Sequence, residues 1–291
     1  AANSLASFPI LFAGSDMQKR DLFDCLNRGG MACFALTEPG AGSDAGAVSC
    51  RAEKVEGGYI LNGTKCFITN APIADKITLF ANTREGGGIR GLTVFLVDAD
   101  TKGISIGKEE DKMGIRASAT AEIIFEDCFV PDSARVGKEG RGFMIAMQTL
   151  QMSRPVVAAI SVGIAQAAIE AAVAYSHHRK QFGVKIATFE MVQQMIADMV
   201  MKTEAARILT YKACVAQMNK DKKAGLYSAM SKCFASDTAM EVTTTAVQVM
   251  GGNGYSRENP VEKYMRDAKI MQIYEGTNQV QRLVIANEAT F

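Results

Sequence analysis

The sequence has no tryptophan, only two histidines, and seven cysteines that are scattered along the chain. The histidines, His177 and His178, are adjacent, and neighbouring side chains on a helix point about 100° apart, which suits shared metal binding poorly. The cysteines form no C-x-x-C pair, and an odd number of them favours reduced thiols over a disulfide framework. We therefore predict no metal site.

Blocks of like charge and long apolar runs are lacking as well. The 32 basic and 31 acidic residues give a net charge of +1, and no basic cluster indicates nucleic-acid binding. No uninterrupted apolar run reaches the ~18 residues of a membrane-spanning helix. Residues 1–8 have neither the basic start nor the apolar core of a signal peptide. We expect no nucleic-acid partner and no membrane span.

The pattern of apolar residues changes near residue 135. Residues 31–135 contain short apolar runs, such as Leu92–Val97, separated by glycine-rich turns, which predicts an antiparallel β-sandwich or barrel. Residues 136–291 have apolar residues three and four apart, which is typical of helices. The predicted fold is α+β, with residues 1–30 as a lead-in, then a β domain and a four-helix bundle. The expected helices span about 140–178, 189–219, 223–249 and 262–287.

Two segments of the predicted β domain could face a ligand. Residues 34–44 read FALTEPGAGSD, in which glycines let backbone N–H groups approach an anion and hydroxyls add donors. Residues 65–70 read KCFITN, in which Phe67 and Thr69 would share one face of a strand and could meet a planar ring. Each pattern alone also fits an ordinary turn or a sheet core.

Two further segments lie among the predicted helices. Residues 179–183 read RKQFG, where arginine could bind a phosphate and phenylalanine could stack on a base, although a helix C-terminus has the same composition. Residues 273–277 read IYEGT, and Glu275 is poorly suited to burial unless the protein uses it. A carboxylate in an apolar pocket has a raised pKa, which suits a general base. A glutamate on a helix surface is the alternative.

In their order and spacing, the segments TEPGAGSD, QVMGGNGY, RDA and YEGT resemble the acyl-CoA dehydrogenase family, with most likeness to its short- and medium-chain branches. The resemblance extends from about Pro9 to Asn287. It implies FAD, an acyl-CoA substrate, α-proton abstraction by Glu275 and β-hydride transfer to the flavin, giving trans-2-enoyl-CoA. It also implies fatty acid β-oxidation, an electron-transfer flavoprotein partner, a homotetramer, and the bacterial cytoplasm or mitochondrial matrix.

The resemblance assigns roles to matching positions. Arg179, Phe182 and the segment from Gln248 would reach the FAD of a neighbouring subunit. The implied cofactor-binding residues are Phe34, Leu36, Thr37, Gly42, Ser43, Phe67, Ile68, Thr69, Arg179, Gln181, Phe182, Gln248, Gly251, Gly252, Thr277 and Gln279. The implied substrate-binding residues are Ser43, Gln151, Arg154, Tyr274 and Gly276.

Three departures from the family pattern stand out. The family usually begins with a helical domain, and residues 8–16 look like the exit from it, so we expect that domain to be missing. Gln151 replaces an aspartate, and Glu190 replaces a glutamine. Some branches carry the base where this chain has Ser153, which leaves Glu275 as the only carboxylate at either position. An enoyl-CoA reductase, or a truncated non-catalytic member acting in assembly, remains as an alternative.

Overall fold

The structure is a computed structural model that describes residues 2–290, and it divides into two compact units. The sheet unit runs to Lys112 and includes Arg116–Leu150, whereas the helical unit contains Met113–Ile115 and the chain from Gln151 onward. The boundary therefore falls within a single helix. The predicted domain limits near residues 30 and 135 stay a prediction.

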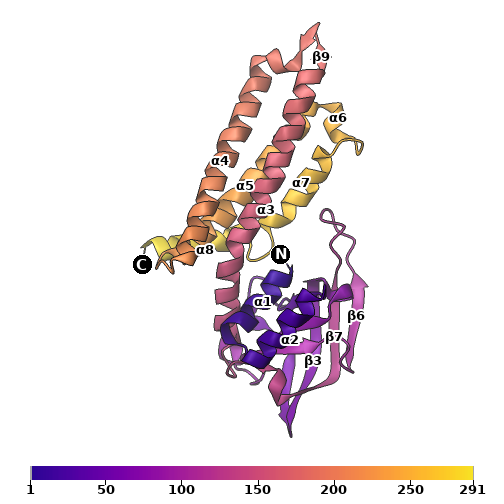
Figure 1. Ribbon diagram of the computed structural model, residues 1–291, viewed down its shortest axis with the longest axis vertical. Coiled ribbons are helices and arrows are strands. Elements are labelled where there is room, and N and C mark those ends of the chain that lie inside the picture. The colour runs from indigo at the N-terminus through magenta and orange to yellow at the C-terminus, as the bar shows by residue number, and fades with distance from the viewer. Residues whose placement is uncertain (1, 291) are drawn as a thin grey trace. The chain divides into compact units, whose positions relative to one another are not determined.

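The sheet unit is built on one eight-stranded sheet with the order β6-β7-β3-β2-β4-β5-β8, and β1 pairs with β4. Figure 1 shows β6, β7 and β3 as neighbours in this sheet. Most pairs are antiparallel as predicted, but β1 and β4 are parallel, and β2 touches β4 in parallel. The β2–β3 hairpin intervenes between β1 and β4, and this long connection permits parallel pairing. The strands are β1 (Ala32–Ala35), β2 (Arg51–Val55), β3 (Gly58–Thr69), β4 (Lys76–Asn82), β5 (Leu92–Asp98), β6 (Ile104–Glu109), β7 (Thr120–Pro131) and β8 (Arg135–Val136).

Two helices, α1 (Ala2–Ala13) and α2 (Asp16–Asn27), pack against this sheet. Ser15 and Gln18 form a capping box at the start of α2, and the Gln18 side chain also donates to the carbonyls of Ser133 and Arg135. Ile10 and Leu22 are fully buried in the core of the sheet unit. Residues 2–30 are thus part of this unit.

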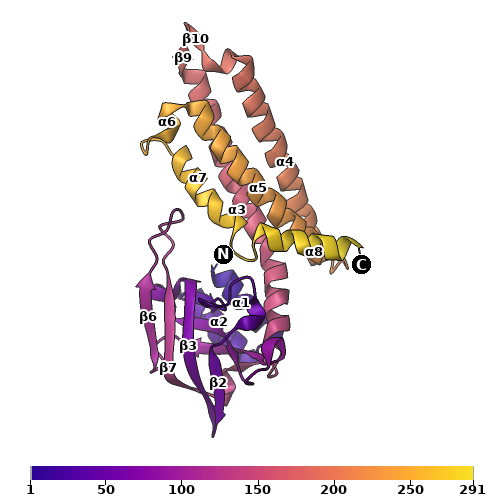
Figure 2. The same ribbon diagram turned by 180° about the vertical axis from the view of Figure 1, so that it is seen from behind.

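The helical unit consists of three long helices and several shorter ones (Figures 1 and 2). Its core is rich in alanine, including Ala165 and Ala168 of α3 and Ala239 and Ala246 of α5, and small side chains allow helices to approach closely. The helices are α3 (Gly142–His178), α4 (Glu190–Met218), α5 (Ala224–Met250), α6 (Gly252–Tyr255), α7 (Val261–Lys269) and α8 (Asn278–Thr290), with a hairpin of β9 (Lys180–Gln181) and β10 (Val184–Lys185) before α4.

The fourth predicted helix, 262–287, is wrong as a continuous element. The chain leaves α7 through a 3₁₀ turn, η6 (Ile270–Gln272), passes through a loop at residues 273–277, and begins α8 at Asn278. Glu275 and Gly276 both have positive φ, which an α-helix cannot contain. Helical periodicity continues on both sides of the loop, so the pattern of apolar residues did not reveal the interruption.

Helix α3 is long and apolar enough to cross a membrane, judged by length and composition alone. No uninterrupted apolar run marks this helix in the sequence, because polar residues such as Gln166 and Glu170 interrupt it. In the structure, Ala165, Ala168 and Ala172 of α3 lie in the core of the helical unit. A helix in the core of a protein can meet the same criteria of length and composition as a membrane-spanning helix.

Candidate active site

Glu275 lies at the tip of the loop between η6 and α8, and the backbone there is left-handed. The φ angles are 54° at Glu275 and +88° at Gly276. The positive φ of Gly276 favours glycine, and a Cβ added there would also displace the Gln281 amide, whose Nε2 atom would lie 2.5 Å away. The residue that carries the carboxylate therefore adopts a conformation that non-glycine residues rarely adopt.

The Glu275 carboxylate is partly buried and accepts a hydrogen bond from the hydroxyl of Ser153 on α3. Burial raises its pKa, and this effect outweighs the Ser153 hydrogen bond and the charges of Lys232 and Arg154, which lower it. Burial, together with the charge of Glu275, also raises the pKa of the neighbouring Tyr274 hydroxyl. A carboxylate with a raised pKa binds a proton more tightly than an exposed one, as a general base requires.

Arg154 follows Ser153 on α3 and is buried. Burial lowers the pKa of its guanidinium, opposed by the charges of Glu275 and Glu288. Its Nε atom has no hydrogen-bond partner among the described residues. A buried donor of this kind normally has a partner, so Arg154 is suited to binding an acceptor on another molecule.

Pro155 explains the local structure of α3 beside Arg154. Proline has no N–H, so the carbonyl of Gln151, four residues earlier, loses its helical donor. The Gln217 side chain of α4 donates to that carbonyl at 3.1 Å. The backbone of Gln151 thus has a structural contact, whatever its side chain binds.

Three residues of the helical unit hold the Glu275 loop, and two of them, Lys232 and Gln281, were not predicted from the sequence. Lys232 of α5 donates to the Gly276 carbonyl, Asn278 accepts from Lys232, and Gln281 donates to the carbonyls of Glu275 and Gly276. Lys232 and Gln281 are fully buried. Lysine is rarely fully buried unless it is paired. A lysine within a stretch of small residues was therefore the sequence feature that could have identified Lys232 as a site residue.

In the sheet unit, the segment 34–44 is anchored by a buried ion pair between Glu38 and Lys65 of β3. Their oxygen and nitrogen lie 2.7 Å apart, and Lys65 also donates to the Leu36 carbonyl at 3.0 Å. The Glu38 carboxylate accepts three further hydrogen bonds, from the backbone N–H and hydroxyl of Ser49 and from the N–H of Cys50. Burial opposes ionisation, but the charge of Lys65 and these hydrogen bonds lower the pKa of Glu38.

The same segment exposes glycine backbone. No described atom lies within 4 Å of a Cβ built on Gly40 or Gly42, and neither residue has positive φ. The fold of this chain therefore does not require glycine at either position, whereas close approach by a ligand would. Ser43 is exposed and Thr37 is partly buried, with the Thr37 carbonyl accepting from the N–H of Cys66.

The other predicted residues of the sheet unit divide by exposure. Phe34 packs against Phe80 with ring centroids 4.8 Å apart, and Leu36 and Ile68 are buried, so these side chains belong largely to the core. Phe67 is 65% exposed, has a φ of 56°, and lies in a β-bulge opposite β7. Thr69 is partly buried. An exposed aromatic ring beside a hydroxyl remains compatible with a flavin wall.

A cavity of about 450 Å³ in the helical unit contains five predicted cofactor residues. Arg179, Gln181 and Phe182 come from the turn after α3, and Gly251 and Gly252 come from the end of α5. Phe182 is 95% exposed and has a φ of 50°. Two segments that lie about seventy residues apart in the sequence thus form one site.

The remaining predicted cofactor residues lie outside this cavity. Gln248 is exposed, and its carbonyl accepts the N–H of Gly251. The Thr277 hydroxyl accepts from the N–H of Val280 and so caps α8, while Gln279 is exposed on that helix. Glu190 begins α4, where a negative charge complements the helix dipole.

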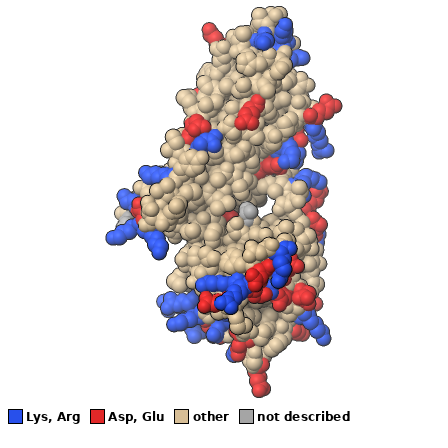
Figure 3. All heavy atoms as spheres, in the orientation of Figure 1, with Lys and Arg blue, Asp and Glu red and all other residues tan. Residues whose placement is uncertain are grey.

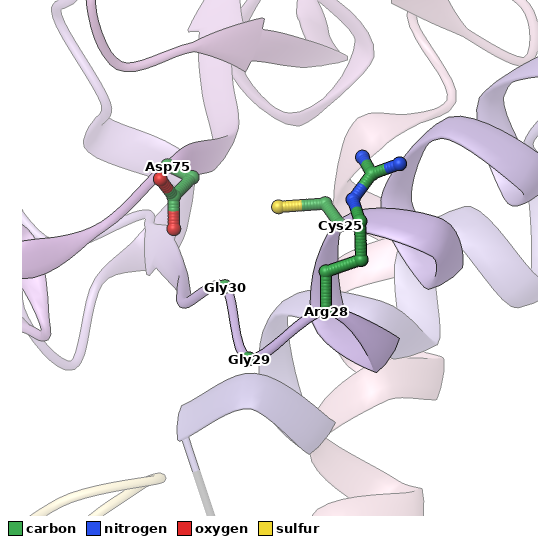
Figure 4. A pocket seen from close by; sticks show the side chains of 5 residues that line it. All are labelled: Cys25, Arg28, Gly29, Gly30 and Asp75. Carbon is green, nitrogen blue, oxygen red and sulfur yellow. The ribbon is translucent and has the colours of Figure 1, made fainter.

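A separate cavity of about 380 Å³ lies in the sheet unit, between the end of α2 and the start of β4. Figure 4 shows the Cys25 thiol directed toward Asp75, with Arg28 beside it. Burial and the charge of Asp75 raise the pKa of Cys25, so the thiol stays protonated and is a poor nucleophile. This cavity contains no predicted site residue. Residues 2–290 contain no group of three His, Cys, Asp or Glu side chains suited to a metal ion.

The chain matches two family models. Residues 33–128 match the middle domain of acyl-CoA dehydrogenase, and residues 140–290 match its C-terminal domain. A similar protein is the mitochondrial short-chain specific acyl-CoA dehydrogenase of Rattus norvegicus, 46% identical over 285 residues, which are 98% of this chain and 69% of that protein.

Two solved structures are also similar. Butyryl-CoA dehydrogenase of Megasphaera elsdenii is 45% identical with a TM-score of 0.97, and the match covers 100% of this chain and 76% of that one. A chain in a structure described as electron transferring flavoprotein of Acidaminococcus fermentans, from work on flavin-based electron bifurcation, is 49% identical with a TM-score of 0.97, over 99% and 76% of the two chains.

Proposed function

Because this chain belongs to the acyl-CoA dehydrogenase family, we propose that Glu275 is the base that removes the α proton of an acyl-CoA thioester. As a member of that family, the chain is a flavin-dependent oxidoreductase that acts on a CH–CH bond, as the sequence predicted. This role for Glu275 is supported by one observation: its carboxylate is partly buried at a left-handed turn, and burial raises its pKa.

The chemistry requires a strong proton acceptor because a C–H bond next to a thioester is only weakly acidic. Burial gives Glu275 a higher proton affinity than an exposed glutamate has, and Ser153 holds its carboxylate in one direction. The negative charge that develops on the thioester oxygen needs donors, and we assign one of them to the backbone N–H of Glu275. Loss of the β hydrogen as hydride then yields the trans-2-enoyl thioester.

FAD is the flavin that fits the described residues. Arg179 can bind a diphosphate, and the exposed ring of Phe182 can stack on adenine within the same cavity. The flavin end of that FAD would be held in the sheet unit of a neighbouring subunit, by the uncovered backbone at Gly42, the Thr37 and Ser43 hydroxyls, and Phe67 with Thr69. When bound, FAD supplies the acceptor for the hydride that leaves the β carbon.

The substrate contacts follow from the chemistry of coenzyme A. Arg154 is a buried cation with an unpartnered Nε, which suits a polar group of the thioester ligand. Gln151 lies one helical turn earlier, and Tyr274 and Gly276 flank the base. Ser43 would meet the coenzyme A arm.

A homotetramer is the proposed assembly. Helix α4 exposes Met201, Ile208, Tyr211, Val215 and Met218 at spacings of seven, three, four and three residues, which places them on one face. Most of the helical-unit surface in Figure 3 is also uncharged. Exposed apolar stripes of this length usually mark an interface, and closed symmetric assemblies are the default for homo-oligomers.

The electron acceptor and the location follow the family. An electron-transfer flavoprotein would reoxidise the flavin, in keeping with the similarity to the Acidaminococcus chain. The bacterial cytoplasm or the mitochondrial matrix is the proposed compartment, and fatty acid β-oxidation is the corresponding metabolic role.

Replacing Glu275 by glutamine tests the base. Glu275→Gln keeps the shape of the side chain but removes the proton acceptor, so flavin bleaching by an anaerobic acyl-CoA should slow by at least about 10²–10⁴-fold. FAD and acyl-CoA binding should persist. Glu258→Gln, an exposed carboxylate of the same unit, is the control. Bleaching at the parent rate in Glu275→Gln would show that another group is the base.

Moving the carboxylate gives a second test. Ser153 contacts the Glu275 carboxylate, so a glutamate at 153 starts close to the same place. Glycine at 275 tolerates the left-handed backbone. Ser153→Glu with Glu275→Gly should recover part of the activity that Glu275→Gly alone loses.

A further inference from the structure

Lys232 is the least expected charged residue near the Glu275 loop. It lies on α5 and is fully buried, and its ammonium donates to the Gly276 carbonyl and to the Asn278 Oδ1 atom, both at 2.8 Å. It forms no ion pair with a described carboxylate. Burial lowers its pKa to about 8, opposed mainly by Cys233 and Glu275. A buried cation with only neutral acceptors is costly to the fold, which points to a role for Lys232 in the loop that it binds.

A second side chain, Gln281, also holds this turn. Gln281 of α8 is fully buried, and its amide donates to the Gly276 carbonyl at 3.1 Å and to the Glu275 carbonyl at 3.4 Å. The two peptide planes that follow Glu275 and Gly276 are therefore both held at their oxygens. These two planes flank Gly276, so the donors restrain its positive φ and the backbone that directly follows Glu275, from which the carboxylate side chain extends.

One face of α5 anchors both ends of the loop. Asn278, the first residue of α8, donates to Ser236 at 2.8 Å and to Asp237 at 2.7 Å. Asp237 also accepts from Gln272, which precedes the loop, at 2.6 Å. Lys232 lies one helical turn from Ser236 on the same face. The loop therefore cannot shift as a whole without breaking contacts of Lys232 or its neighbours.

We propose that Lys232 is a positioning residue that holds the left-handed Glu275–Gly276 turn, and so aims the Glu275 carboxylate at the α carbon of the substrate. This inference rests on the proposed role of Glu275 as the base. Lysine suits the task because one ammonium can donate to a carbonyl and an amide oxygen at the same time, and its positive charge strengthens both bonds.

The test replaces Lys232 by methionine in the full chain. Methionine matches the length of the side chain but has no donor, so the turn can relax while the core remains filled. With FAD and acyl-CoA present, kcat should fall about 10- to 100-fold, because small misplacements of a reacting group have effects of that size. KM should change less than about threefold. Lys222→Met, at an exposed lysine of the same unit, is the matched control and should keep parent values.

A second readout reports on the loop itself. Amide hydrogen exchange of the peptide that covers residues 273–281 should become faster in Lys232→Met without acyl-CoA, while the peptide that covers the α3 core should be unchanged. Lys232→Ala supplemented with ethylammonium should regain part of the lost rate. Tetramethylammonium, which has no N–H, should restore none.

The outcomes separate this inference from the assignment of the base. Parent kcat and parent loop exchange in Lys232→Met would overturn the positioning role, even if Glu275→Gln is inactive. Parent bleaching in Glu275→Gln would instead overturn the base. If Lys232→Met, Lys232→Gln and Lys232→Ala all fail to fold, the lysine serves the fold alone and the positioning role is overturned.

Discussion

The sheet unit and the helical unit each place a glutamate and a fully buried lysine at a glycine-containing segment, yet the two glutamates have opposite proton affinities. Glu38 pairs directly with Lys65 and accepts three more hydrogen bonds from Ser49 and Cys50. Glu275 accepts one from Ser153, and Lys232 binds the backbone next to it. Burial affects both, but the pKa of Glu38 is lowered and that of Glu275 is raised.

The difference shows how the number of donors decides the role of a buried carboxylate. Four donors stabilise the charge of Glu38 so well that it is an anchor and a poor base. Among residues 2–290, Ser153 is the one donor to the Glu275 carboxylate, which retains a high proton affinity, while Lys232 fixes its backbone instead of neutralising its charge. The same two residue types therefore form a structural clamp in one unit and the proposed base with its support in the other.

The largest expected effect is the loss of stability when the Glu38–Lys65 ion pair of the sheet unit is broken. Lys65→Met leaves the Glu38 carboxylate buried without its cation and should lower the free energy of unfolding by about 3–5 kcal/mol, measured by urea denaturation. Lys54→Met removes the exposed partner of Asp132 and should cost at most about 1 kcal/mol. Equal losses in the two variants would contradict the anchoring role of Lys65.

The pH dependence of stability should have opposite signs for the two glutamates. The folded-state pKa of Glu38 is lowered, so its contribution is present above the unfolded pKa of about 4.5 and is lost as pH falls. Wild type should exceed Glu38→Gln in stability at neutral pH, and the difference should shrink in acid. The folded-state pKa of Glu275 is raised, so Glu275→Gln should be more stable than wild type at neutral pH and converge with it in acid. Thermal unfolding from pH 4 to 7.5 measures both.

The ionisation of Lys232 should have a smaller effect on stability, and at alkaline pH. Its folded-state pKa is about 8, below the ordinary value of 10.5, so the folded protein releases this proton before the unfolded chain does. Because of Lys232, the free energy of unfolding should therefore increase as pH rises from about 8 to about 10.5. Subtracting the curve of Lys232→Met from that of wild type isolates this rise, and a flat difference would refute it.

The smallest expected effects come from two serines. Ser49→Ala removes one hydroxyl bond to Glu38 but leaves the Ser49 N–H on the same oxygen, so it should cost about 1–2 kcal/mol of stability. Ser153→Ala removes the hydroxyl that lowers the pKa of Glu275. The acid limb of the pH–rate profile for flavin reduction should then move to higher pH. No movement of that limb would mean that Ser153 does not tune the base.

The local patterns of the sequence predicted the helices α3, α4 and α5 and the succession of short strands, because periodicity depends only on neighbouring residues. They also located Glu275, since a glutamate followed by glycine within an apolar stretch is unusual. The cavity that brings Arg179 and Phe182 together with Gly251 could be predicted only through the family resemblance, because nothing local joins those segments.

The sequence by itself determined the succession of short strands, the helices α3, α4 and α5, and which glutamate is a candidate base. Only the tertiary structure decided which glutamate has a raised pKa, because that depends on donors far away in the sequence, such as Ser153 for Glu275, 122 residues apart. Likewise, Lys232 lies 44 residues from the Gly276 carbonyl that it binds. A pKa and a left-handed turn are properties of an environment, and residues from several elements must come together before that environment exists.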